Sequence, residues 1–168
     1  PSADLFLAKV EPPFLQPKAS EDEEVDGQTA LVFTPLEVSF NVSNGVSCFL
    51  NSYVVRYYTT DGKALNGGKF DRSGAMSLFV SAPPMTWEEK KESGEEEDTA
   101  VADDKTAVDI FSPALYSYMS KGNSIVTDDI SPVIARVEFS GRDVNDRNVT
   151  AVTQVDLITT LQEDDDSE

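Results

Sequence analysis

The stretch VIARVEFSGRDVNDRNVTAVTQVDLIT, residues 133–159, indicates the fold class because two alternating runs flank a polar turn. In the first run the polar Arg136 and Glu138 alternate with the apolar Val137 and Phe139. Such period-two alternation is typical of a β-strand that buries one face in a core and turns the other to water. The stretch therefore predicts two antiparallel strands that close an all-β domain.

Similar runs recur along the rest of the chain at the spacing of an all-β domain. We expect further strands within residues 3–11, 29–42, 47–59, 74–82 and 106–111. Segment 112–122 predicts one short helix, because a serine that can cap it is followed by a proline suited to the first helical position. These elements predict an immunoglobulin-like, two-sheet antiparallel sandwich of about seven strands, with the short helix before the penultimate strand.

Length and charge indicate one domain with acidic appendages. The 168 residues are enough for a single core, and we assign residues 1–162 to it, with an N-terminal strand in residues 1–13. Nineteen of the 31 acidic residues fall in residues 21–26, 88–104 and 163–168, so the net charge of −18 is concentrated outside a nearly neutral body. The runs predict an acidic loop after the first strand, which includes residues 21–26, a second acidic loop at 84–105 and an acidic tail at 163–168.

The same composition limits the classes of function. Nucleic acid is not expected as a partner, because phosphate binding needs clustered lysine and arginine. No run of apolar residues is long enough to span a membrane. The chain has no histidine and a single cysteine, Cys48, which removes the histidine-based nucleophile arrangements and any multi-cysteine metal site. We therefore expect no enzyme, no catalytic residue, no cofactor and no resident metal, and we expect Cys48 to be a buried strand residue.

Four segments carry a resemblance to a known group of proteins. They are SADLFLAKVEPP, NSYVVRYYTTDGK, the helical SPALYSYMSKG and the closing SPVIARVEFSGRDVNDRNVTA. In this order they resemble small exported β-sandwich domains of bacterial lipoproteins and cell-surface proteins with an immunoglobulin-like core. The resemblance implies a location in the periplasm, on the outer cell surface or outside the cell. It also implies that any lipid-bearing cysteine would precede Pro1.

Two places in the sequence are candidates for contact with a partner protein. In the first strand, Leu5 and Leu7 occupy one face of an ideal strand while Phe6 and Val10 occupy the other. A strand that is apolar on both faces needs cover on both, and exchange of this strand with a neighbouring copy would supply it. Trp87, beside the acidic loop, is the second candidate, as an exposed anchor or as a lid over the sandwich.

Three functions remain open from the sequence. The first is a non-enzymatic structural or interaction module of a cell surface or extracellular assembly. The second is a filament subunit that assembles by exchange of its N-terminal strand, for which an ordinary first strand is the alternative. The third is a weak calcium- or ligand-binding module, because the turn at Asp143, Asn145, Asp146 and Asn148 carries oxygen ligands, although such residues also favour turns for backbone reasons.

Overall fold

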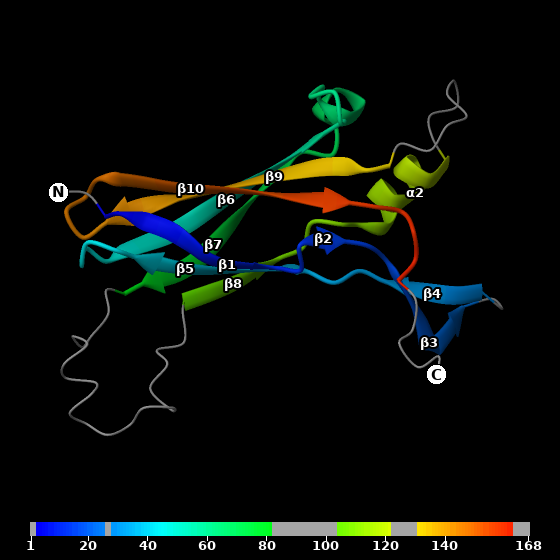
Figure 1. Cartoon of the computed structure of the whole chain (residues 1–168), viewed down its shortest axis with the longest axis horizontal. Helices are drawn as coiled ribbons and strands as arrows, with labels where there is room; N and C mark the ends of the chain where they lie inside the picture. Colours follow the sequence, from blue (N-terminus) through cyan, green and yellow to red (C-terminus); the bar gives the residue numbers. More distant parts are fainter. Residues whose placement is uncertain (1–2, 26–27, 82–103, 122–130, 163–168) are drawn as a thin grey trace.

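The computed structural model describes residues 3–25, 28–81, 104–121 and 131–162. In these ranges the chain forms ten strands, one α-helix and a short 3-10 helix (Figure 1). The strands are β1 (Leu5–Glu11), β2 (Phe14–Leu15), β3 (Lys18–Val25), β4 (Gln28–Val32), β5 (Leu36–Val42), β6 (Cys48–Tyr58), β7 (Arg72–Val80), β8 (Asp104–Val108), β9 (Val133–Asp143) and β10 (Asn148–Leu157). The helices are η1 (Leu65–Gly68) and α2 (Pro113–Lys121).

The strands form three sheets. A three-stranded sheet has the order β1-β5-β8, a five-stranded sheet has the order β2-β10-β9-β6-β7, and β3 pairs with β4 as a separate two-stranded sheet. Neighbouring strands are antiparallel except for β2, which runs parallel to β10. The all-β class is therefore confirmed, whereas the described part of the chain has ten strands in three sheets, not about seven in two.

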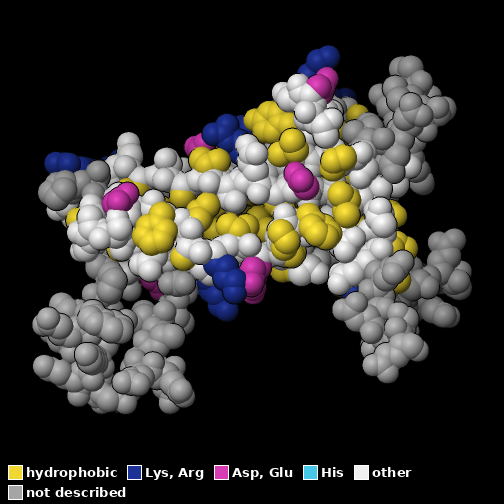
Figure 2. Space-filling model, in the orientation of Figure 1, with side chains coloured by type: hydrophobic (Ala, Val, Ile, Leu, Met, Phe, Trp, Pro, Cys, Tyr) yellow, Lys and Arg dark blue, Asp and Glu magenta, His cyan; other side chains and the backbone are white. Residues whose placement is uncertain are grey.

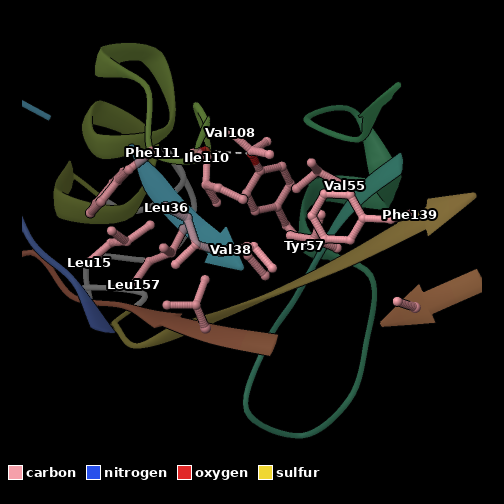
Figure 3. Packing of buried hydrophobic residues seen from close by; sticks show 14 of the residues in the cluster. Leu15, Leu36, Val38, Val55, Tyr57, Val108, Ile110, Phe111, Phe139 and Leu157 are labelled. Atoms are coloured by element: carbon pink, nitrogen blue, oxygen red, sulfur yellow. Dashed lines mark hydrogen bonds between the residues drawn. The ribbon is translucent and has the colours of Figure 1, made fainter. Parts of the chain in front are cut away.

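The core lies between the two larger sheets. Phe40 of β5 meets Phe139 of β9 edge to face, with ring centroids 5.0 Å apart. Leu36 and Val38 of β5 point toward Leu157 of β10 in the same layer (Figure 3). These side chains alternate with half-buried or exposed ones along their strands, so the period-two pattern of the sequence places the apolar face of each sheet in one shared core.

The acidic run at residues 21–26, expected to be part of a loop, lies mainly in β3. Lys18 pairs with Val32 and Val25 with Gln28, so β3 and β4 form a ribbon that extends away from the two larger sheets (Figure 1). A highly charged segment is expected to be a loop because it cannot bury enough apolar surface to stabilise an ordered structure. A two-stranded ribbon can keep backbone hydrogen bonds while facing water, and this explains the difference.

The helix forms where the sequence predicts it. Pro113 is its first residue, and the Ser112 hydroxyl oxygen accepts a hydrogen bond from the Leu115 N–H at 3.2 Å. Leu115 and Met119, one turn apart, are both buried in the core. Gly122, expected to end the helix, lies outside the described residues. In the described ranges, no helix combines the length and the apolar character needed to cross a bilayer.

The lone thiol is buried, as predicted. Cys48 begins β6 and is 1% exposed. Burial, followed by the nearby charges of Asp143 and Asp104, raises the pKa of the thiol, so the reactive thiolate is disfavoured at neutral pH. We expect Ellman's reagent to modify Cys48 in urea but not in the native protein. Rapid modification without denaturant would show instead that this end of β6 opens in the folded state.

Candidate partner-binding groove

The first strand does not have two apolar faces in the folded chain. A bulge between Leu7 and Lys9 shifts the alternation of β1, so that Val10 packs against the core together with Leu5 and Leu7. Phe6 remains outside, with 43% of its surface exposed. β1 pairs with β5 of its own domain, as expected of an ordinary first strand. The difference arises because an extra residue at a bulge reverses the faces that follow it.

Trp87, the second candidate, lies outside the described residues, as does most of the acidic loop at 84–105. The last two residues of the expected loop form part of a strand instead. Asp104 and Lys105 already belong to β8 and pair with Phe40 and Ser39 of β5. The acidic tail at 163–168 also lies outside the described residues.

The structure has a surface groove of about 590 Å³ where the chain passes from β1 to β2. Pro12, Pro13 and Phe14 line one side of it, and Pro35, just before β5, lines another. The carboxylates of the lining come from Glu11 and Glu37. We call this feature the β1–β2 groove. Its volume lies in the range of about 300–1,000 Å³ that is usual for ligand sites.

The groove follows from the sheet topology. β1 belongs to the three-stranded sheet and β2 to the five-stranded sheet, so the chain changes sheets at Pro12 and Pro13. Neither proline has an N–H to continue a ladder, and the sheets therefore separate there. The segment after β10 closes the far side. Its Ile158 N–H donates to the Leu15 carbonyl at 3.0 Å, and the Gln162 N–H donates to the Pro17 carbonyl at 2.9 Å.

Exposed apolar side chains lie in the groove, at Phe14, and on the neighbouring segments, at Leu161 and Val32. Phe14 is 42% exposed, Leu161 44% and Val32 47%. The segments that carry them are adjacent, because Lys18 bridges Gln162 on one side and pairs with Val32 on the other. Figure 2 shows hydrophobic side chains gathered on this face, where β2 lies between β1 and the end of β10. Clustered apolar surface of this kind marks sites of interaction more often than scattered exposed residues do.

The electrostatics of the groove are acidic. Glu11 and Glu37 are direct cross-strand partners on β1 and β5, an arrangement of like charges that disfavours pairing. Lys9 offsets part of this charge, with its Nζ atom 2.8 Å from Oε1 of Glu11. The hydrogen bond to Glu11, and then the charges of Glu11 and Glu37, raise the pKa of Lys9. Glu37 forms no ion pair with any described residue, so its carboxylate is available at the edge of the groove.

A second exposed apolar spot lies on the outer face of the five-stranded sheet. Phe49 of β6 and Phe79 of β7 are cross-strand partners, 40% and 52% exposed. On its other side Phe49 lies opposite Arg142 of β9. Arg142 forms an ion pair with Asp146, with Nη1 2.9 Å from Oδ1. This spot is a flat part of a sheet, whereas the β1–β2 groove is hollowed. The groove is therefore the better candidate for a specific binding site.

In the turn that the sequence offers as a calcium site, the carboxylate of Asp143 accepts hydrogen bonds from backbone N–H groups. Oδ1 of Asp143 accepts hydrogen bonds from the N–H groups of Asn145 at 2.8 Å and Arg147 at 2.9 Å. Oδ2 accepts a third from the Ala3 N–H at 2.9 Å. The described residues contain no group of three or more acidic or cysteine side chains placed to hold a metal ion. The geometry therefore supports the turn-forming role of these residues.

We expect Asp143→Ala to lower the unfolding temperature at neutral pH, because three N–H groups lose their acceptor. Asp143→Asn, which keeps one acceptor oxygen, should lie between this variant and the native protein. Hydrogen bonds, first of all from the Arg147 N–H, lower the pKa of Asp143. Its contribution is therefore complete above the ordinary value of 3.8 and is lost as the pH falls through the lowered pKa. Thermal unfolding followed by circular dichroism should show the difference narrowing in acid, and a pH-independent difference would contradict this account.

No pattern in the sequence by itself indicates the β1–β2 groove. Its lining comes from residues 11–16, 34–37 and 162, which are far apart in the chain. The available signal was the concentration of prolines at strand ends, at Pro12, Pro13 and Pro35, beside the apolar Phe14. Comparison of the chain with protein-family models finds no model that matches it, and comparison with curated proteins finds no match either.

Proposed function

We propose that this chain is a non-enzymatic interaction module of an exported or cell-surface assembly, and that it binds a partner protein through the β1–β2 groove. The observation that carries the proposal is the hollow where the chain passes between the two sheets, with Phe14 exposed in its lining and Leu161 and Val32 exposed on neighbouring segments. Exposed apolar side chains that gather beside a hollow mark an interaction site more often than single exposed ones do. The groove offers rigid apolar walls and hydrogen-bond acceptors, which suit binding.

The proposed domain type is immunoglobulin-like. Supporting it, β5 lies between β1 and β8 in one sheet, while β6, β9 and β10 are adjacent in the facing sheet. This places non-consecutive strands side by side, as the long connections of a Greek key do. On this interpretation β3 and β4 are an insertion. The exported location, and a lipid anchor before Pro1, belong to the same proposal and rest on the resemblance described above.

A photocrosslinking experiment tests the proposed partner site. Benzoylphenylalanine is placed at Phe14 in the groove or, as a matched control, at Phe79 on the outer sheet face, because both phenylalanines are exposed. We expect irradiation of native cells to give a discrete adduct with another protein from position 14 and none from position 79. No adduct from position 14, or an adduct from position 79 alone, would overturn the groove as the site. Recovery of the chain in the cytosol would overturn the exported location.

A further inference from the structure

We infer that the β1–β2 groove binds an arginine side chain carried on an apolar segment of a partner protein. The inference rests on the proposed function and specifies the chemistry of the partner. It starts from the direct pairing of Glu11 with Glu37 across β1 and β5. Two carboxylates at this position repel one another, and a cation bound between them would remove that repulsion.

The charges around the pair leave room for one more cation. Lys9 lies against Glu11 at 2.8 Å, on a side chain that is 63% exposed. Glu37 forms no ion pair with any other part of the described chain. A carboxylate has two oxygens and accepts the paired N–H groups of a guanidinium in parallel. The free acceptor capacity at the groove therefore lies mainly on Glu37.

The walls of the groove favour arginine over lysine. Pro12, Pro13 and Pro35 have no backbone N–H and present flat apolar rings, against which the alkyl part of a long side chain can pack. Phe14, 42% exposed, adds an aromatic face. A planar guanidinium stacks on aromatic rings and is more weakly hydrated than an ammonium group, so it loses less on entering such a site.

The neighbouring surface indicates what should flank the arginine. Leu161 and Val32, both exposed, lie on the segments beside the groove. Apolar side chains on either side of the arginine would cover them. The net charge of −18 also attracts basic partners over long range and repels acidic ones, including nucleic acid. The partner segment is thus basic and apolar, in complement to the groove.

The test uses a short synthetic peptide, Ala-Leu-Arg-Leu-Ala with blocked ends, titrated into the isotope-labelled full chain and followed by NMR. We expect the amide resonances of Glu11, Phe14 and Glu37 to shift, and those of Phe49 and Phe79 to stay. The same peptide with glutamine or glutamate in place of arginine should not shift them. The lysine peptide should bind more weakly than the arginine peptide.

Matched variants isolate the role of the two carboxylates. Glu11→Gln with Glu37→Gln should weaken binding of the arginine peptide about tenfold or more, because a charge-assisted hydrogen bond is lost. Asp109→Asn with Glu138→Gln removes the same charge just after β8 and on β9, at positions that do not line the groove, and should leave binding nearly unchanged. The groove variant loses the exposed Lys9–Glu11 ion pair, which contributes little, and relieves the cross-strand repulsion. It should therefore unfold at about the same temperature as the native chain, so weaker binding would not reflect unfolding.

Two results would overturn the inference. The first is equal binding of the arginine and glutamine peptides, or no shift at the groove with either. The second is self-association in sedimentation that the Glu11→Gln, Glu37→Gln variant abolishes, because the occupant would then be a second copy of the chain. The peptide titration tests the arginine, whereas the crosslinked adduct from position 14 tests whether the groove binds a partner at all. Failure of the arginine inference can therefore be distinguished from failure of the proposed function.

Discussion

Replacing Gly141 by alanine should lower the free energy of unfolding by about 3 kcal/mol or more, as overpacking against rigid backbone does. Gly141 lies on β9, the central strand of the five-stranded sheet, and pairs with Leu50 of the neighbouring β6. A Cβ atom added there would lie 1.9 Å from the Phe49 carbonyl oxygen and 2.7 Å from the Leu50 Cα. Both are backbone atoms of β6, so a change of rotamer cannot relieve the clash.

The close approach arises from a bulge. Between Leu50 and Ser52 the register of β6 shifts against both of its neighbours, β7 and β9. The bulge moves the backbone of β6 toward β9 at the position that Gly141 occupies. Strand glycines often mark such approaches, and elsewhere in a strand a change to alanine would usually be favourable. The expected sign at Gly141 is therefore opposite to the usual one.

Gly74 provides the comparison for urea unfolding experiments. Its added Cβ would lie 2.5 Å from the ring of Tyr53, its cross-strand partner on β6. This clash is with a side chain, so Gly74→Ala should cost less, and most of its cost should disappear in a Tyr53→Ala background. Gly141→Ala should keep its full cost in that background. A Gly141→Ala protein as stable as the native chain would show that β6 and β9 do not approach closely at the bulge.

Local signals in the sequence were sufficient to place most elements of the fold. The pairs Asn44-Gly45 and Asp61-Gly62 are typical of turns that need a positive φ, and Gly45 and Gly62 adopt φ angles of 73° and 86°. The helix begins at Pro113 after its serine cap, as expected. Each of these features depends on neighbouring residues alone, which is why a single sequence reveals them.

Features that depend on backbone pairing, on an inserted residue or on the order of strands in the sheets were not predicted. The β3–β4 ribbon forms from backbone pairing that charge composition does not encode. The bulge in β1 reverses the face of Val10, and alternation alone cannot reveal an inserted residue. The β1–β2 groove needs Pro12 and Pro35, which are far apart in the chain, to come together at the end where β1 pairs with β5. The candidate site was therefore missed because the sheet order creates it.

The stability of the protein should decrease between about pH 10 and pH 12 because of Tyr57. This side chain is 3% exposed, and its hydroxyl donates a hydrogen bond to the Ile110 carbonyl at 2.5 Å, as Figure 3 shows. Burial is the main cause that raises the pKa of Tyr57 to about 12, from 10.0, with smaller contributions from the charges of Asp71 and Tyr53; the charge of Arg72 acts in the opposite direction. The unfolded chain therefore releases this proton at a lower pH than the folded one.

The sign and size of the effect follow from that difference. Below pH 10 both states keep the proton and Tyr57 contributes no pH dependence; above it, deprotonation favours the unfolded chain until the folded pKa is passed. A difference of about two pKa units corresponds to a loss of about 2.7 kcal/mol. Tyr57→Phe provides the control. It leaves the Ile110 carbonyl without its donor and should cost about 1–2 kcal/mol at neutral pH.

The difference in unfolding free energy between the native protein and Tyr57→Phe is the quantity to measure. Lysines and the other tyrosines titrate in both proteins, so subtracting one from the other isolates Tyr57. We expect urea titrations to show the native protein more stable at pH 9 and this advantage disappearing, then reversing, as the pH approaches 12. An advantage that stays constant over this range would mean that Tyr57 titrates normally, and that the hydroxyl reaches water in place of Ile110.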